Sequence, residues 1–257
     1  MKKSFIALIA LCMGFVLSIP SVSLAKNSPK KVISVGADTT FPPFEMEEHG
    51  KVTGFDIDLI HAIAKKEGLK IKLSTMDFQG LIPALQTGTI DVAVAGITIT
   101  DQRAKVVNFS HPYYHSGLSI LVKKNSPIHS LENLNGKTVA VKLGTTSDLM
   151  MSKQAGVKVQ RFTNIDDAYN QMQNGGADAV VFDNPVNLNY AKTHPNVHVV
   201  GKLLTGEDYG FAVTKKDPWL LKKVNDGLFK VYKSGEYAKL YKHYFGQDEH
   251  GLVKIEK

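Results

Sequence analysis

The hydrophobic and polar positions follow two different periods along the chain. Short β-rich apolar runs alternate with longer segments in which apolar residues recur at helical spacing. The pattern predicts strands over residues 32–37, 71–76, 90–95, 138–141, 157–162, 179–182 and 197–200. It predicts helices over 55–67, 81–86, 165–174, 185–193, 218–233 and 236–245. Strands that alternate with helices indicate an α/β fold built on parallel sheets.

A short repeat suggests that the chain contains two similar α/β lobes. Residues 86–94 read QTGTIDVAV and residues 173–181 read QNGGADAVV, an offset of 87 (173 − 86). Two β-prone runs, 117–122 and 209–213, flank the second half of the pattern. We therefore expect the chain to leave one lobe, build the second and return, so that the two crossings form a hinge beside a cleft.

The predicted boundaries follow from this path. Residues 26–115 with 213–257 are expected to form the larger lobe, and residues 116–212 the second lobe, with hinge strands at its ends. The polar residues 246–257 are expected to be a loose tail.

The N-terminus has the three parts of a secretory signal peptide. Lys2 and Lys3 precede an apolar run over residues 6–19, and small residues at Ser23 and Ala25 follow it. The run is shorter than the roughly 20 residues that a spanning helix needs. We expect cleavage after Ala25 and a periplasmic protein. Its only cysteine, Cys12, lies within the removed segment, too early for a lipid anchor, so no disulfide is expected.

Charge and motifs exclude several functions. The formal charge is +7, or near +5 without Lys2 and Lys3, and the lysines are scattered, so we expect no nucleic-acid partner. The sequence has no Gly-x-Ser-x-Gly elbow, phosphate loop or HExxH motif. His111 and His115 are separated by Pro112, which disfavours a shared helical face. No catalytic residue, cofactor or metal site is predicted.

Two loops at strand ends are suited to an anion. Arg103 follows the strand at 90–95, and Asp101 is expected to cap a short helix there. A guanidinium fork matches a carboxylate, and backbone N–H groups near Thr98 add donors. Residues 144–148 (GTTSD) open a helix whose amides also favour an anion. An exposed arginine and an ordinary helix cap are equally good local interpretations.

Other loops offer a carboxylate and aromatic walls. Asp183 ends one apolar strand, where it either caps the next helix or pairs with an ammonium group. Asp38 ends the first strand, and Phe41 follows in a proline-containing loop. Phe78 is another loop aromatic, and core packing is usually the better interpretation of either ring. An anion site, a cation site and aromatic walls together suit a zwitterion.

At these residues the chain resembles the polar amino-acid-binding proteins that feed ABC importers, most closely the periplasmic glutamine-binding proteins. The matching stretches are 38–44 (DTTFPPF), 54–58 (GFDID), 76–88 (MDFQGLIPALQTG), 95–103 (AGITITDQR), 141–145 (VKLGT) and 241–246 (YKHYFG). The resemblance implies a type II periplasmic-binding-protein fold, with two parallel or mixed sheets flanked by helices and joined by a two-strand hinge. It also implies a monomer that docks on a membrane permease.

The resemblance also implies roles for individual residues. Arg103 and the amides of Thr98 and of the loop containing Gly144, Thr145 and Thr146 would hold the ligand carboxylate. The Gly96 carbonyl, the Thr98 hydroxyl and Asp183 would hold its ammonium group. Phe41 and Phe78 would enclose the ligand side chain, and Asp38 and Lys142 would meet its far end.

The last two residues bear on the choice of ligand. A cationic Lys142 disfavours arginine, lysine or histidine, and Asp38 disfavours glutamate, whereas the amide of glutamine satisfies both. In the alternative arrangement, Lys142 pairs with Asp183 or another acid and does not meet the ligand side chain. Phe182 stands where glutamine-binding proteins often have histidine. Binders of arginine, lysine, histidine or another polar amino acid therefore stay open.

Two other classes of protein are alternatives. An exported lyase similar to cyclohexadienyl dehydratase would use the same scaffold, with Asp38 or Asp183 as its acid. The sensor domain of a receptor is disfavoured because the sequence has no membrane segment after Ala25.

Overall fold

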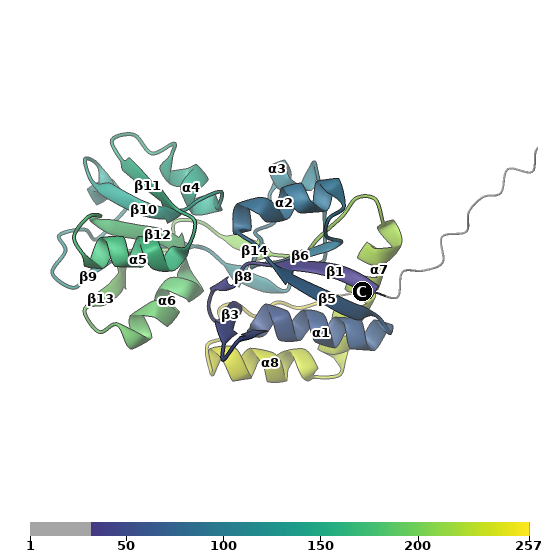
Figure 1. Cartoon of the computed structure of the whole chain (residues 1–257). Coiled ribbons are helices and arrows are strands. Elements are labelled where there is room, and N and C mark those ends of the chain that lie inside the picture. Colours follow the sequence, from purple (N-terminus) through teal and green to yellow (C-terminus); the bar gives the residue numbers. More distant parts are fainter. Residues whose placement is uncertain (1–31, 257) are drawn as a thin grey trace, which may run out of the picture. The chain divides into compact units, whose positions relative to one another are not determined.

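The computed structural model describes residues 32–256, which form two α/β lobes (Figure 1). The predicted signal peptide over residues 1–25 lies outside the described residues. The sheet of the first lobe has the strand order β5 (Lys70–Thr75), β1 (Val32–Ala37), β6 (Val92–Val94), β15 (Ala212–Val213) and β7 (Asn108–Phe109). β1 is parallel to β5 and β6, whereas β15 is antiparallel to both of its neighbours.

The second lobe repeats this plan. Its sheet has the order β11 (Lys158–Phe162), β10 (Thr138–Lys142), β12 (Ala179–Asp183), β9 (Leu118–Lys123) and β13 (Val197–Val200). β10 is parallel to β11 and β12, and β9 is antiparallel to β12 and β13. The prediction of an α/β fold with parallel or mixed sheets is confirmed, because the buried strands alternate with helices in both lobes.

Helices flank both sheets. The first lobe has α1 (Phe55–Glu67), α2 (Phe78–Thr87), α3 (Asp101–Ala104), α7 (Pro218–Lys233) and α8 (Glu236–Phe245). The second has η1 (Glu132–Leu134), α4 (Thr146–Met151), α5 (Ile165–Gln173) and α6 (Asn184–Thr193). α1 buries one face, including Leu59 and Ile63, and packs closely on α7 at Gly227, where a Cβ atom would lie 2.8 Å from Ile63 Cγ2.

The two crossings between the sheets run through β8 (Tyr114–Ser116) and β14 (Glu207–Tyr209), which pair with each other antiparallel. The run predicted over 117–122 instead forms β9 inside the second sheet, because its side chains are almost wholly buried. The run over 209–213 is divided between β14 and β15 of the first sheet. The exact lobe boundaries, at 115/116 and 212/213, stay a prediction.

The sequence repeat corresponds to one structural unit in each lobe. Asp91 accepts a hydrogen bond from Ser34 N (2.7 Å) and returns one from its own N–H to Ser34 O (2.8 Å). Asp178 makes the same two bonds with Thr138, both at 2.8 Å. In each lobe this aspartate therefore fixes the start of one parallel strand against its neighbour.

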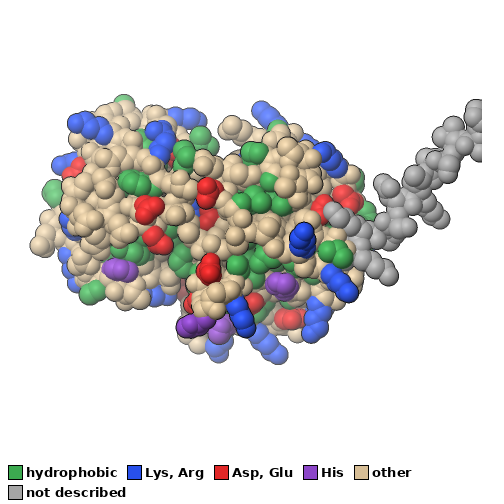
Figure 2. Space-filling model, in the orientation of Figure 1, with side chains coloured by type: hydrophobic (Ala, Val, Ile, Leu, Met, Phe, Trp, Pro, Cys, Tyr) green, Lys and Arg blue, Asp and Glu red, His purple; other side chains and the backbone are tan. Residues whose placement is uncertain are grey.

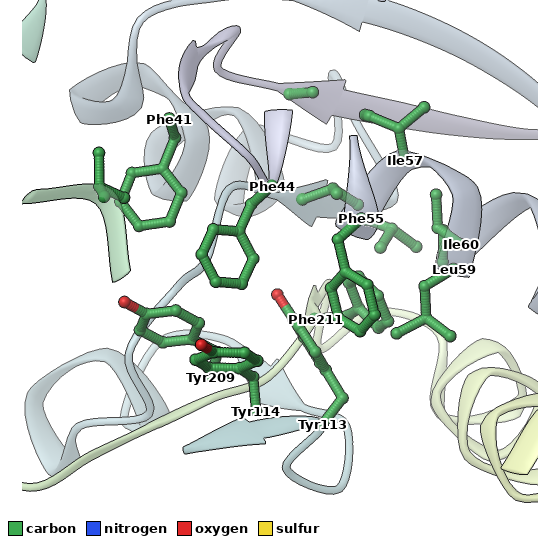
Figure 3. Packing of buried hydrophobic residues seen from close by; sticks show 14 of the residues in the cluster. Phe41, Phe44, Phe55, Ile57, Leu59, Ile60, Tyr113, Tyr114, Tyr209 and Phe211 are labelled. Atoms are coloured by element: carbon green, nitrogen blue, oxygen red, sulfur yellow. The ribbon is translucent and has the colours of Figure 1, made fainter. Parts of the chain in front are cut away.

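Aromatic rings fill the region where the first lobe meets the crossing strands (Figure 3). Tyr114 and Tyr209 stack at 5.6 Å, and Phe44 packs edge-on against both of them. Aromatic pairs of this kind add stability beyond the area they bury. The hinge strands are thus anchored in a core.

The C-terminal segment is part of this core, so the expectation of a loose tail is wrong. Val253 and Ile255 are buried, and His115 N donates to Gly251 O at 3.0 Å. Gly251 N in turn donates to Tyr241 Oη at 3.0 Å. Val253 and Ile255 alternate with polar residues, so their side chains lie on the same, buried side of this segment.

Three shorter strands precede α1: β2 (Thr40–Phe41), β3 (Glu45–Glu48) and β4 (Lys51–Thr53) form a separate antiparallel sheet. This sheet carries Phe41 towards the second lobe. On the face drawn in Figure 2, lysine and arginine side chains are spread over both lobes, as the scattered lysines predicted.

Candidate ligand-binding site

A cavity is lined by residues from both lobes. It brings together all the site residues that the sequence predicted: Asp38, Phe41, Phe78, Gly96, Thr98, Arg103, Lys142, Thr145, Thr146 and Asp183. Ala95 and Phe182 complete the lining. Loops at the carboxyl ends of parallel strands supply most of these residues, as expected for an open α/β sheet.

Lys142, at the end of β10, is buried and bonded to three acceptors. Its Nζ lies 2.7 Å from Asp38 Oδ2, and it donates to Thr40 O (3.2 Å) and Thr40 Oγ1 (2.7 Å). Asp38 also accepts from Thr40 N and from Phe78 N, at 2.8 and 3.0 Å. Lys142 therefore pairs with an acid, as one part of the alternative arrangement has it, but both partners line the cavity and the charge of Lys142 is compensated there.

Arg103 lies on α3 and lines the cavity. Thr100, and not Asp101 as predicted, caps this helix, and its hydroxyl accepts from Arg103 N at 3.2 Å. The guanidinium donates to Thr98 O (2.9 Å) and Gly144 O (3.3 Å) and lies 5.2 Å from the centre of the Phe78 ring. Burial lowers the pKa of Arg103, Asp183 and Glu207 raise it, and the group stays cationic.

The loop before α4 has the predicted helix start. Thr145 caps α4: its hydroxyl accepts from Asp148 N (3.3 Å) and donates to Lys142 O (2.7 Å). Gly144 N donates to Asp148 Oδ2 at 3.1 Å, and Thr145 N donates to Lys142 O at 3.4 Å. Two of the three amides of this loop that the resemblance assigned to a ligand carboxylate thus already have acceptors within the protein, and the third belongs to Thr146.

Asp183 ends β12 and is buried beside the first lobe. Its carboxylate makes no capping bond to α6, one of the two roles considered for it, and accepts instead from the Tyr209 hydroxyl on β14. Burial, followed by the nearby charge of Glu207, raises the pKa of Asp183 to about 7, although Tyr209 and Arg103 act to lower it. A buried carboxylate of this kind is a site for a cationic group.

Gly96 and Phe41 form a closely fitted wall. Gly96 has a φ of 50°, and a Cβ atom there would lie 2.2 Å from the Phe41 ring. Its N–H donates to the buried Asp56 Oδ2 at 3.0 Å. The Phe41 ring meets the Phe182 ring edge-on at 5.6 Å, so an aromatic side chain from each lobe borders the cavity.

Four residues at this site escaped the sequence analysis. Thr40 bonds Lys142, and Asp56 holds Gly96. Glu207 and Tyr209 contact the site from β14: Glu207 reaches Thr98, 109 residues earlier, and Tyr209 reaches Asp183, 26 residues earlier. Thr40 lies inside a stretch quoted for its resemblance, but no local pattern marked Glu207, because its partners come together only in the fold.

Within residues 32–256, no cluster of three or more histidine, cysteine or acidic side chains is arranged to hold a metal ion. In the same range, no helix combines the length and the apolar character needed to span a bilayer.

Comparison with protein families identifies the class. Residues 33–247 match the bacterial extracellular solute-binding proteins, family 3, and the chain belongs to this family. It is 38% identical to a probable histidine-binding protein of Neisseria gonorrhoeae, over 86% of this chain and 85% of that protein. It is 36% identical to a glutamine-binding protein of Bacillus subtilis (strain 168), with coverages of 89% and 85%.

Solved structures give the same picture. The chain is similar to an ancestral arginine-binding protein bound to glutamine, with a TM-score of 0.81, 48% identity, and coverage of 85% of this chain and 99% of that one. It is also similar to an ancestral amino-acid-binding protein called a precursor of cyclohexadienyl dehydratase (TM-score 0.78, 43% identity, coverages of 84% and 96%). These likenesses confirm the two-lobed fold.

Proposed function

We propose that this protein is the periplasmic binding component of an ABC importer for a polar amino acid, that its ligand is L-glutamine, and that it is not an enzyme. The observation that carries the proposal is one cavity that contains Arg103, Asp183 and the Asp38–Lys142 ion pair. Relatives whose names specify histidine or glutamine binding support the same class of ligand.

The two poles of an amino acid match two groups in the cavity. The Arg103 guanidinium has donors for an α-carboxylate, and Asp183 provides the carboxylate for an α-ammonium group. The Gly96 carbonyl and the Thr98 hydroxyl are further acceptors on the same wall. A zwitterion leaves the net charge of the cavity unchanged, which limits the electrostatic cost of enclosing it.

The far end of the cavity favours a neutral polar side chain. The charges of Lys142 and Asp38 compensate each other, so neither is free to neutralise a charged ligand. A cationic ligand side chain is repelled by Lys142, and an anionic one is repelled by Asp38. The amide of glutamine donates to Asp38 and accepts from Lys142. Arginine and histidine are the competing ligands, since the ion pair weakens the repulsion that Lys142 alone would exert.

Transport follows from closure of the lobes over the ligand. The closed form binds amino acid more tightly than the open form, and this difference drives the change that a membrane permease recognises. The protein acts as a monomer. Its signal peptide directs export and is cleaved after Ala25.

The decisive test is calorimetric titration of the purified protein after unfolding and refolding to remove carried ligand. We expect tight one-to-one binding of L-glutamine, with weaker binding of L-arginine, L-histidine and L-lysine. Binding heat with L-arginine or L-histidine, but not with L-glutamine, would support an amino-acid-binding protein and contradict glutamine as its ligand. No heat with any amino acid overturns the proposal.

One observation favours a second function. Asp183, with a pKa of about 7, has the protonation behaviour of a general acid, which a dehydratase needs. Incubation with prephenate or arogenate followed by detection of the aromatic product tests this lyase alternative. We expect no product, because the Asp183 carboxylate is bonded to Tyr209 and faces an ammonium site.

A further inference from the structure

Glu207 connects the two lobes at the cavity through a single carboxylate oxygen. Its Oε2 accepts from Thr98 Oγ1 at 2.7 Å and from Thr146 Oγ1 at 3.2 Å. Thr98 belongs to the first lobe, Thr146 starts α4 in the second, and Glu207 itself lies on the crossing strand β14. Its Oε1 accepts from Thr205 Oγ1 at 3.3 Å. The carboxylate is therefore held in position from three directions.

These bonds decide what the two hydroxyl groups offer to a ligand. A threonine hydroxyl has one proton and two acceptor lone pairs. With the proton of Thr98 directed to Glu207, its oxygen presents only acceptor capacity to the cavity, and the same holds for Thr146. Acceptors are what an ammonium group requires and what a ligand carboxylate avoids.

Glu207 also sets the electrostatic balance of this end of the cavity. Its charge interacts with those of Asp183 and Arg103. Two acids beside one guanidinium leave an excess of negative charge when both are ionised. That excess attracts a ligand that carries a cation next to its carboxylate and disfavours a ligand that carries a carboxylate alone.

We propose that Glu207 is a specificity-determining residue, which selects α-amino acids against the corresponding acids without the amino group by fixing Thr98 and Thr146 as acceptors and by its own charge. This inference rests on the proposed function and adds a residue to that site. Glu207 acts through Thr98 and Thr146 and does not line the cavity, so it is a positioning residue.

The test compares two ligands that differ only in the α-amino group. Titrate the full protein and its Glu207→Gln variant with L-glutamine and with 4-carbamoylbutanoate, or with L-arginine and 5-guanidinopentanoate if arginine proves to be the ligand. We expect E207Q to reduce the preference for the amino acid at least tenfold, mainly through weaker binding of the amino acid. A purely structural role would weaken both ligands equally.

Asp208→Asn is the matched control, since Asp208 is the next carboxylate on β14 and pairs with the exposed His115. D208N should leave the preference unchanged. A second measurement uses Thr98→Val: the T98V and E207Q losses should be less than additive, because both remove the same oriented acceptor.

The outcomes separate the two proposals. If the unmodified protein binds no amino acid, the proposed function fails. If it binds an amino acid and E207Q keeps the full preference against the ligand without the amino group, the inference about Glu207 fails while the proposed function stands.

Discussion

Lys142 and Asp38 form an ion pair across the two lobes, with Nζ 2.7 Å from Oδ2 and side chains that are 1% and 4% exposed. Lys142 comes from β10 in the second sheet, and Asp38 follows β1 in the first. A buried pair of this kind costs a desolvation penalty that its hydrogen bonds must offset. Here Thr40 supplies those bonds, so the pair joins the two lobes at one end of the cavity.

Removing the charge of Lys142 and removing the charge of Asp38 should change ligand selectivity in opposite directions. Lys142→Met leaves Asp38 without its cation, so we expect affinity for L-arginine or L-lysine to rise at least tenfold relative to L-glutamine, a difference of about 1.4 kcal/mol. Asp38→Asn leaves Lys142 uncompensated and should lower the same ratio. Calorimetric titration of both variants with the three amino acids measures it. An equal loss for every ligand in both variants contradicts the assigned position of the pair.

Arg103 should be essential for affinity but not for folding. Its guanidinium is half-buried at the cavity and makes only two hydrogen bonds to backbone oxygens. Hydrogen bonds to charged groups contribute about 1.5–3 kcal/mol each, so Arg103→Ala should weaken amino-acid binding by about a hundredfold or more. Circular dichroism and thermal unfolding should remain close to those of the unmodified protein.

Arg103→Lys is the matched variant for this prediction. It keeps the charge and loses the planar fork, so its affinity should fall between those of the unmodified protein and R103A. Near-normal affinity of R103A would remove Arg103 from the site.

Asp183 should make ligand binding depend on pH. Burial and Glu207 raise the pKa of this carboxyl to about 7, whereas an ammonium ligand needs the ionised form. Below pH 7 the protonated carboxyl must therefore release its proton on binding, and affinity should fall about tenfold per pH unit. Above pH 7 the affinity should be level, since the carboxylate is already ionised.

Titration in buffers of different ionisation enthalpy checks this directly. Between pH 5.5 and 6.5 we expect nearly one proton to be released per ligand, and none at pH 8. Asp183→Asn should bind weakly and without this slope. An affinity that stays constant from pH 8 to 5.5 would show that Asp183 is ionised throughout or is not the ammonium partner.

The sequence was informative wherever one local pattern determined a feature. Buried apolar runs located the strands, and glycines with helical flanks located the repeat around Asp91 and Asp178. The family resemblance identified the residues that line the cavity. Partners that depend on tertiary contact were not predictable: the sequence offers Lys142 several acids, and only the fold shows that its partner is Asp38.

The hinge and the tail show the same distinction. The run 117–122 has the β propensity of any strand, and its place in the second sheet depends on pairing with β12 and β13. Val253 and Ile255 are two apolar residues in a polar segment, and both are buried in a core cluster made mostly by residues far away in the sequence. Neither relationship is visible in a local window.

A buried pair of acids supports the wall of the cavity from behind. Glu45 and Asp56 are both fully buried and interact with each other. Asp56 accepts from Gly96 N and from the Tyr113 hydroxyl, which stabilise its charge. Burial, followed by the charge of Asp56, raises the pKa of Glu45 well above its usual value. Burial raises the pKa of Asp56 as well. Because two neighbouring buried carboxyls do not readily ionise together, we expect the pair to share one proton.

Because the two acids share a proton, we expect two conservative variants to change the free energy of unfolding in opposite directions. A carboxyl whose pKa is raised by folding destabilises the protein as pH increases from its unfolded-state pKa of roughly 4.3 towards the folded one. Glu45→Gln removes that penalty, so its free energy of unfolding should equal or exceed that of the unmodified protein at pH 8 and depend less on pH. Asp56→Asn loses the ionised acceptor of Gly96 N and should lose about 1–3 kcal/mol. Urea unfolding at pH 5 and pH 8 measures both, and an E45Q variant as unstable as D56N at pH 8 would mean that Glu45 is ionised in the folded protein.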